Sequence, residues 1–202
     1  MGNVMDYLEW RGDLTFDQSP FNDVDNVILS QLAYVNFRDV IPSVQMNKGI
    51  TLKAAAQLFF DLHTEEELMQ DKSFIKDAPK LLKKAAQTNR FRDVILSDYV
   101  DMVDETLEKQ FGAFHIKLSP QCTYVAFRGT DDTLVGWKED FNMSFISPVP
   151  SQEDAVKYLD DTCSYIRGKL YVGGHSKGGN LAIYSAIHCS KRVRKKIQCV
   201  YN

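Results

Sequence analysis

The stretch YVGGHSKGGNLA, residues 171–182, places one serine among four glycines where an apolar segment gives way to a helical pattern. KLYVGG, residues 169–174, predicts a short buried strand, and residues 178–188 predict a helix. Ser176 falls at the junction. A strand that turns directly into a helix strains the residue at the turn, and Gly174 and Gly178 remove side chains that would collide there. The stretch therefore predicts a sharp turn from which the Ser176 hydroxyl projects.

The elements around this turn predict the fold class. Residues 151–166 form an amphipathic helical pattern, which Ser151 could cap and Gly168 could end. KIQCVYN, residues 196–202, predicts another strand. Helix, strand, helix and strand joined by short connections predict a mostly parallel sheet with helices on both faces. We therefore expect an α/β protein of α/β-hydrolase-like type.

The N-terminal half predicts two further parts. Apolar residues recur at helical spacing over residues 22–35, Thr51 could cap a second helix, and Asp77 with Pro79 could start a third. From Asp93 the pattern changes to strands joined by tight connections. We expect a helical region, residues 1–90, packed on a core, residues 91–202, within a single domain.

Gly174-His175-Ser176-Lys177-Gly178 matches the pattern G-x-S-x-G, which holds a nucleophilic serine when it lies between a strand and a helix. In that setting the Lys177 N–H could stabilise an oxyanion. The alternatives are a serine that only caps the helix and a phosphate-binding loop, but the Walker spacing is absent. Neighbouring side chains diverge around such a turn, so we expect His175 to pack beneath it and Lys177 to be a solvated or pocket-rim charge.

A second polar segment follows the apolar strand YVAF, residues 124–127. Thr130 could offer both a backbone N–H and a hydroxyl to an oxyanion, and Gly129 would let a substrate approach closely. Thr130 and Lys177 are therefore the candidate oxyanion-hole residues.

AFRGTDD, followed by Trp137 and Asp140 and later by GGHSKGG, resembles the class 3 lipases. The opening stretch, residues 6–34, more closely resembles a bacterial domain-of-unknown-function family of α/β-hydrolase-like proteins related to those lipases. The resemblance implies ester hydrolysis, with Ser176 as nucleophile and Thr130 in the oxyanion hole. It also implies that Arg128, Trp137 and Asp140 mainly build the loop, and that residues 131–136 lie where a lid often occurs, although no long apolar lid helix is evident.

The acid and the base of a serine hydrolase are missing after Ser176. The chain has no Asp or Glu there, and His188 lies about 18 Å further along the predicted helix, at about 1.5 Å per residue. We therefore expect the chain to be the N-terminal portion of a longer fold, with the acid and a His base beyond Asn202. The shortened chain would be inactive by itself, and its exposed sheet edge would favour self-association.

Composition limits the remaining function classes. The net charge of −3 gives no general attraction to nucleic acid, and the basic cluster SKRVRKK, residues 190–196, is interpreted as complementing a helix dipole. The scattered cysteines, HTEEE and the aspartates at 98, 101 and 104 lack metal-site spacing, so we expect no metal and no cofactor. No apolar run could span a membrane and no secretion signal opens the chain, which favours the cytoplasm.

Two hypotheses follow from the sequence. The first is a serine esterase that cleaves a carboxylic ester or thioester of a small molecule or lipid through an acyl-enzyme on Ser176. The second is a non-catalytic binding protein that keeps the turn as architecture.

Overall fold

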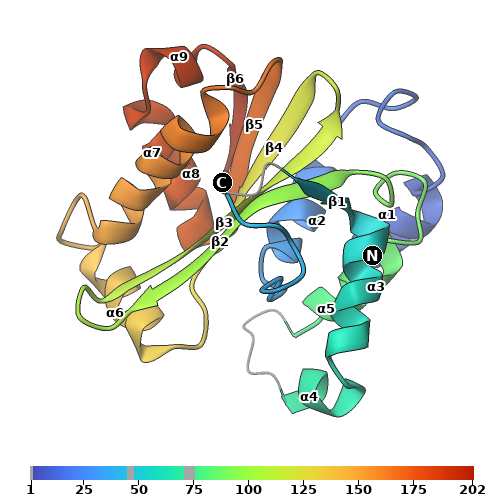
Figure 1. Cartoon of the computed structure of the whole chain (residues 1–202), viewed down its shortest axis with the longest axis horizontal. Helices are drawn as coiled ribbons and strands as arrows, with labels where there is room; N and C mark the ends of the chain where they lie inside the picture. Colours follow the sequence, from blue (N-terminus) through green and yellow to red (C-terminus); the bar gives the residue numbers. More distant parts are fainter. Residues whose placement is uncertain (1, 45–47, 71–75) are drawn as a thin grey trace.

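The computed structural model describes residues 2–44, 48–70 and 76–202. It is an α/β structure in which helices flank a six-stranded mixed sheet (Figure 1). The strands are β1 (Gly49–Thr51), β2 (Ile95–Asp104), β3 (Lys109–Ser119), β4 (Cys122–Phe127), β5 (Lys169–Gly174) and β6 (Ile197–Tyr201). The helices are α1 (Val4–Arg11), α2 (Asp23–Leu32), α3 (Leu52–Leu62), α4 (Glu65–Gln70), α5 (Ala78–Ala85), α6 (Leu134–Asn142), α7 (Pro150–Cys163), α8 (Lys177–His188) and α9 (Lys191–Arg194).

The strands lie in the sheet in the order in which they occur along the chain. β1 to β4 pair antiparallel, whereas β4 with β5 and β5 with β6 pair parallel. The expectation of a mostly parallel sheet is therefore wrong. Short turns join β2 to β3 and β3 to β4, and such turns can connect only antiparallel neighbours, whereas the parallel pairs use α7 and α8 as crossovers.

Both faces of the sheet are covered, as the sequence predicts. Tyr124 and Ala126 of β4 belong to the apolar core beneath α2, α3 and α5, while Val125 and Phe127 belong to the core beneath α7 and α8. This alternation follows from the two-residue period of a strand, which turns successive side chains to opposite faces. Figure 1 shows α7 and α8 on one side of the sheet and the N-terminal helices on the other.

Helices α2 and α3 each begin at a capping side chain, and the sequence predicts the Thr51 cap. The side chain of Asn22 accepts from the N–H groups of Val24 and Asp25 at the start of α2, and Thr51 accepts from Ala54 at the start of α3. The predicted cap of α7 is wrong: Val149 takes the cap position and Pro150 begins the helix. Ser151 lies inside the first turn, because proline is favoured at the first helical position.

A buried ion pair joins the N-terminal segments to one another. The Arg90 guanidinium donates to both carboxylate oxygens of Asp25 on α2, and both side chains are fully buried. Arg90 also donates to the carbonyls of residues 14, 15, 19 and 20. One side chain thus fixes the course of the irregular segment between α1 and α2.

None of the helices in the described part of the chain is long and apolar enough to cross a membrane.

Candidate active site

Ser176 stands between the end of β5 and the start of α8, in a backbone conformation that non-glycine residues rarely adopt. Its φ is 58° and its ψ is −125°. Its hydroxyl does not cap α8, and the serine is exposed. A residue held in such a conformation costs about 1–3 kcal/mol, and such strain gathers at functional sites. The geometry therefore excludes the capping serine and matches a turn that presents a nucleophile.

Two glycines make this turn sterically possible. A Cβ on Gly174 would come within 2.5 Å of the Gly178 carbonyl carbon, and a Cβ on Gly178 would lie 2.3 Å from the Phe127 carbonyl oxygen. Either contact is too short for real atoms, so the backbones of β4, β5 and α8 meet only because these side chains are missing. This confirms why the sequence places glycine at both positions.

Thr130 lies in the loop that follows β4, next to the Ser176 turn. The preceding residue, Gly129, approaches so closely that a Cβ there would lie 2.5 Å from the His175 carbonyl oxygen. Thr130 is buried, and within the described residues its hydroxyl has no hydrogen-bond partner. Its backbone N–H and that of Lys177 also find no protein acceptor in this part of the chain. The N–H of the first residue of a helix has no partner within the helix, and an oxyanion requires free donors of this kind.

Tyr34 contacts both segments of the site and was not predicted from the sequence. Its hydroxyl lies 3.0 Å from His175 Nδ1 and within 3.5 Å of the His175 carbonyl oxygen. A Cβ on Gly129 would lie 2.0 Å from the same hydroxyl. Burial raises the pKa of Tyr34 to about 12, so it remains a neutral phenol at physiological pH. No local pattern marks Tyr34, because it follows α2, 142 residues before Ser176.

The side chain of His175 does not pack beneath the turn, as the sequence had suggested. The residue is exposed, and its Nδ1 lies 3.0 Å from the hydroxyl of the buried Tyr34. Its ring stands edge-on to the Tyr34 ring, with centroids 5.8 Å apart.

The prediction that Lys177 is a solvated or pocket-rim charge is also wrong. Its ammonium is fully buried and lies 3.0 Å from Glu139 Oε2 of α6. It also donates to the Gln110 carbonyl and to Gln110 Oε1 of β3, each at 2.7 Å. Burial lowers the pKa of Lys177, and the Glu139 carboxylate opposes that effect. Only the tertiary structure brings these three residues together.

The other three residues predicted to build the loop differ in their burial. Arg128 is buried and ion-paired with Asp101 of β2, which holds the start of the loop against the sheet. Trp137 is 58% exposed and Asp140 is also exposed, so neither packs inside the loop. The short helix α6, Leu134–Asn142, begins inside the region 131–136 that the resemblance implies for a lid and extends beyond it.

None of the four histidines forms a hydrogen bond with Ser176 within the described residues. His63 ends α3, His188 ends α8, and His175 bonds to Tyr34. His115 is buried in β3, where its ring contacts Asp98 and Thr162. A general base for Ser176 therefore does not come from the histidines as they lie in this structure.

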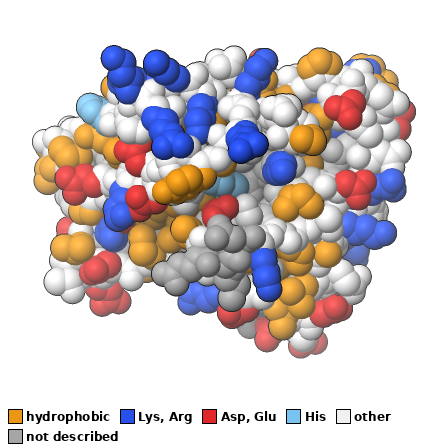
Figure 2. Space-filling view, turned by 45° about the horizontal axis from the view of Figure 1, so that its top comes forward, with side chains coloured by type: hydrophobic (Ala, Val, Ile, Leu, Met, Phe, Trp, Pro, Cys, Tyr) orange, Lys and Arg blue, Asp and Glu red, His pale blue; other side chains and the backbone are white. Residues whose placement is uncertain are grey.

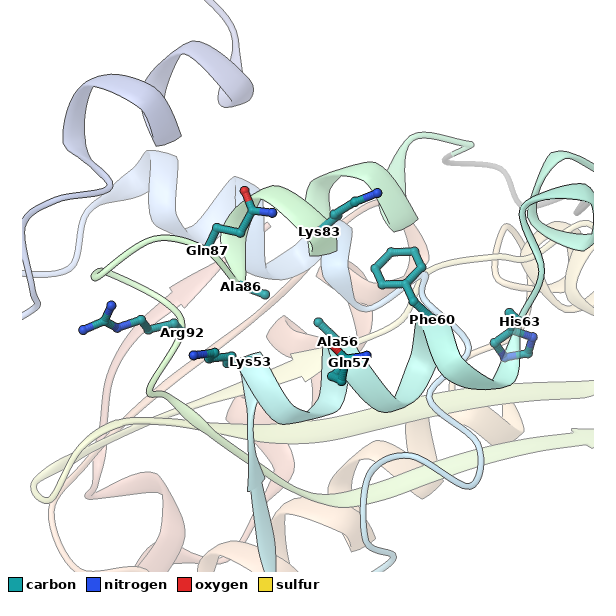
Figure 3. Close-up of a pocket in the computed structure, with 9 residues that line it drawn as sticks. All are labelled: Lys53, Ala56, Gln57, Phe60, His63, Lys83, Ala86, Gln87 and Arg92. Carbon is teal, nitrogen blue, oxygen red and sulfur yellow. The ribbon is translucent and has the colours of Figure 1, made fainter.

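A separate hollow of about 550 Å³ lies between α3 and α5. Figure 3 shows Phe60 and Lys83 at one part of it and Lys53 and Arg92 at the other. Its lining comes from residues 53–63 and 83–92, so it shares no residue with the Ser176 site.

Figure 2 shows several basic side chains along the upper part of the face that it draws. The exposed residues Lys191, Arg192, Arg194 and Lys195 belong to α9 and its end. Arg194 donates to the Ile187 carbonyl in the last turn of α8, a contact expected from a cation that complements a helix dipole.

Comparison with known protein families gives a match to the segment that contains both Thr130 and Ser176. A family model described as Mbeg1-like matches residues 85–202, more than half of the chain. The chain belongs to the Mbeg1-like family. This corrects the resemblance to class 3 lipases and their relatives, because the Mbeg1-like family is not a lipase or α/β-hydrolase family. The lipase resemblance rests on AFRGTDD and GGHSKGG, and such short motifs can be shared by unrelated families. No curated protein and no solved structure matches the chain.

Proposed function

We propose that this protein is a serine hydrolase that cleaves a carboxylic ester or thioester through an acyl-enzyme on Ser176. One observation carries the proposal: the strained, exposed Ser176 stands at the N-terminus of α8, and its hydroxyl is not used for capping. A serine that served only as architecture would gain nothing from this strain, whereas a nucleophile needs access to its substrate.

The surrounding groups support an acyl-transfer reaction. The Ser176 Oγ attacks the ester carbonyl and gives its proton to a general base, while the carbonyl oxygen takes the negative charge. The N–H groups of Lys177 and Thr130 are donors available to that oxygen. Collapse expels the alcohol or thiol, which takes up the proton, and water then releases the acid by the same route.

The proposal includes an acid and a histidine base supplied from beyond Asn202. The proposal needs them because none of His63, His115, His175 and His188 bonds to Ser176 within the described residues. The 202-residue chain by itself would then react slowly, because a serine without its base loses orders of magnitude in rate.

The exposed Ser176 turn also favours a second function, the binding of an anion without a reaction. Without a base, the turn and its unpaired donors could bind a carboxylate or another anion without reaction. The protein would then be a binding module rather than an enzyme.

A fluorophosphonate probe separates the two functions. In the natural full-length protein we expect labelling at Ser176, located by peptide mass spectrometry, and hydrolysis of short p-nitrophenyl esters. Ser176→Ala should abolish the labelling and lower the hydrolysis rate by about a thousandfold or more. Ser185→Ala, which changes a buried serine of the same helix, serves as the control. Equal hydrolysis by wild-type and Ser176→Ala protein would remove Ser176 from the mechanism.

A further inference from the structure

Glu139 is the centre of a fully buried polar cluster behind the Ser176 turn. Its Oε2 accepts from the Lys177 ammonium and from the Gln110 N–H, each at 3.0 Å, and its Oε1 accepts from the Ser151 N–H at 2.9 Å. The carboxylate therefore joins α6 to α8, to β3 and to the first turn of α7. Both charged side chains of the Glu139–Lys177 pair have no exposed surface.

This cluster connects the two segments that carry the proposed oxyanion donors. Lys177 directly follows the nucleophile, and Glu139 lies on the helix that directly follows the Thr130 loop. Between them, a Cβ on Gly136 would lie 3.2 Å from Thr130 Cγ2 and 3.3 Å from Gln110 Oε1. The Thr130 loop, α6 and Gln110 are thus packed without free space against one another, and the ion pair links them to the turn.

A buried ion pair is a poor means of gaining stability, because removing two charges from water costs as much as their attraction returns, and apolar replacements often stabilise. What such a pair provides is a directional link. Here the link runs between two backbone donors that must be about 3 Å from one oxygen atom at the same time.

We propose that Glu139, through its buried ion pair with Lys177, is a positioning residue that holds the Thr130 loop and the Ser176 turn at the separation an oxyanion requires. The inference rests on the proposed function for its catalytic meaning. Its structural part, the coupling of the loop to the turn, does not depend on catalysis.

The test uses the double variant Glu139→Gln/Lys177→Met of the natural full-length protein, which removes both charges and leaves no unpaired ion in the core. The maximal labelling rate at Ser176 by a fluorophosphonate should fall about tenfold to a hundredfold, because displacement of a catalytic group by about 1 Å has an effect of this size. The apparent affinity for the probe should not change, since the probe's binding surface is intact.

A second readout does not require a reaction. Amide hydrogen exchange of the peptide spanning residues 128–133 should become faster in the double variant, while exchange of the β5 peptide stays as in the wild type. The matched control is Lys109→Met/Asp154→Asn, which removes a 2.7 Å ion pair between the same strand, β3, and α7 without touching the turn.

The outcomes distinguish the proposed hydrolase function from the positioning role of Glu139. If wild-type protein is not labelled, the proposed function fails, and the exchange of residues 128–133 alone decides the positioning claim. Unchanged labelling and exchange in the Glu139 and Lys177 double variant would overturn the inference. An equal loss in the control variant would overturn it as well, because the effect would then be general loosening of β3.

Discussion

Gly178 lies where three backbones meet, and its missing side chain is a structural requirement. A Cβ there would stand 2.3 Å from the Phe127 carbonyl oxygen and 3.1 Å from the Arg128 carbonyl carbon. Neither neighbour is the flexible end of a side chain, so the clash can be relieved only by moving β4 or the Ser176 turn. The residue therefore controls both the stability and the geometry of the site.

Gly178→Ala should lower the free energy of unfolding by about 1–3 kcal/mol, the usual cost of overpacking, even though alanine favours helices. Urea unfolding followed by circular dichroism measures the change. Gly2→Ala is the matched control, because a Cβ on Gly2 would meet nothing closer than 3.9 Å. A stability of Gly178→Ala equal to that of the wild type would show that the turn can shift freely.

At the scale of elements, the N-terminal helices are connected by the Asp25–Arg90 pair rather than by packing alone. The Arg90 guanidinium donates to the Asp25 carboxylate on α2 and to four carbonyls of the irregular segment that precedes α2. Burial and this pairing act in opposite directions on the pKa of Arg90, which is raised overall. Loss of the carboxylate would leave a buried cation with neutral partners only.

Asp25→Asn should therefore destabilise the protein by about 3–5 kcal/mol, the range found when one partner of a buried pair is removed. Thermal and urea unfolding measure it. Asp161→Asn, which removes the partner of Lys157 on the exposed face of α7, should leave the unfolding midpoint unchanged. A midpoint for Asp25→Asn within the error of the wild type would mean that the irregular segment is held by other contacts.

At the scale of the whole molecule, a buried histidine should make the stability dependent on pH. His115 lies in the core between the sheet and α7, with its Nδ1 3.3 Å from Asp98 Oδ2 and its Nε2 3.6 Å from Cys163 Sγ. Burial by itself lowers the pKa of His115, but Cys163 and Asp98 outweigh it and raise the pKa to about 9. The folded protein thus binds the imidazole proton more tightly than the unfolded chain does.

This contribution to the free energy of unfolding is fully present below the unfolded pKa of about 6.5 and is lost as the pH rises through about 9. We expect a decrease of up to about 3 kcal/mol across that window, measured by urea unfolding at intervals of pH. Asp98→Asn should flatten the decrease, whereas His188→Gln, an exposed change, should not. A wild-type stability that is constant from pH 6.5 to 9 would contradict the raised pKa.

The sequence by itself determined the elements and the turn. Local signals were sufficient for the helical spacing of α2, for the capped start of α3 at Thr51, for β2 to β6, and for the place of Ser176 between a strand and a helix. These features depend on residues close in the chain, such as Thr51 directly before Leu52 or the glycines on either side of Ser176. Short motifs also misled, since they suggested a lipase relationship that the Mbeg1-like family does not share.

Only the tertiary structure decided what surrounds the serine. It brought Tyr34 against the turn and buried the Lys177 ammonium against Glu139. No spacing in the chain could reveal these contacts, because lysine and glutamate are ordinarily exposed and enter a core only when a distant partner compensates for the lost water. The choice of partner is made by packing between α6, β3 and α8, which exists only once the chain has folded.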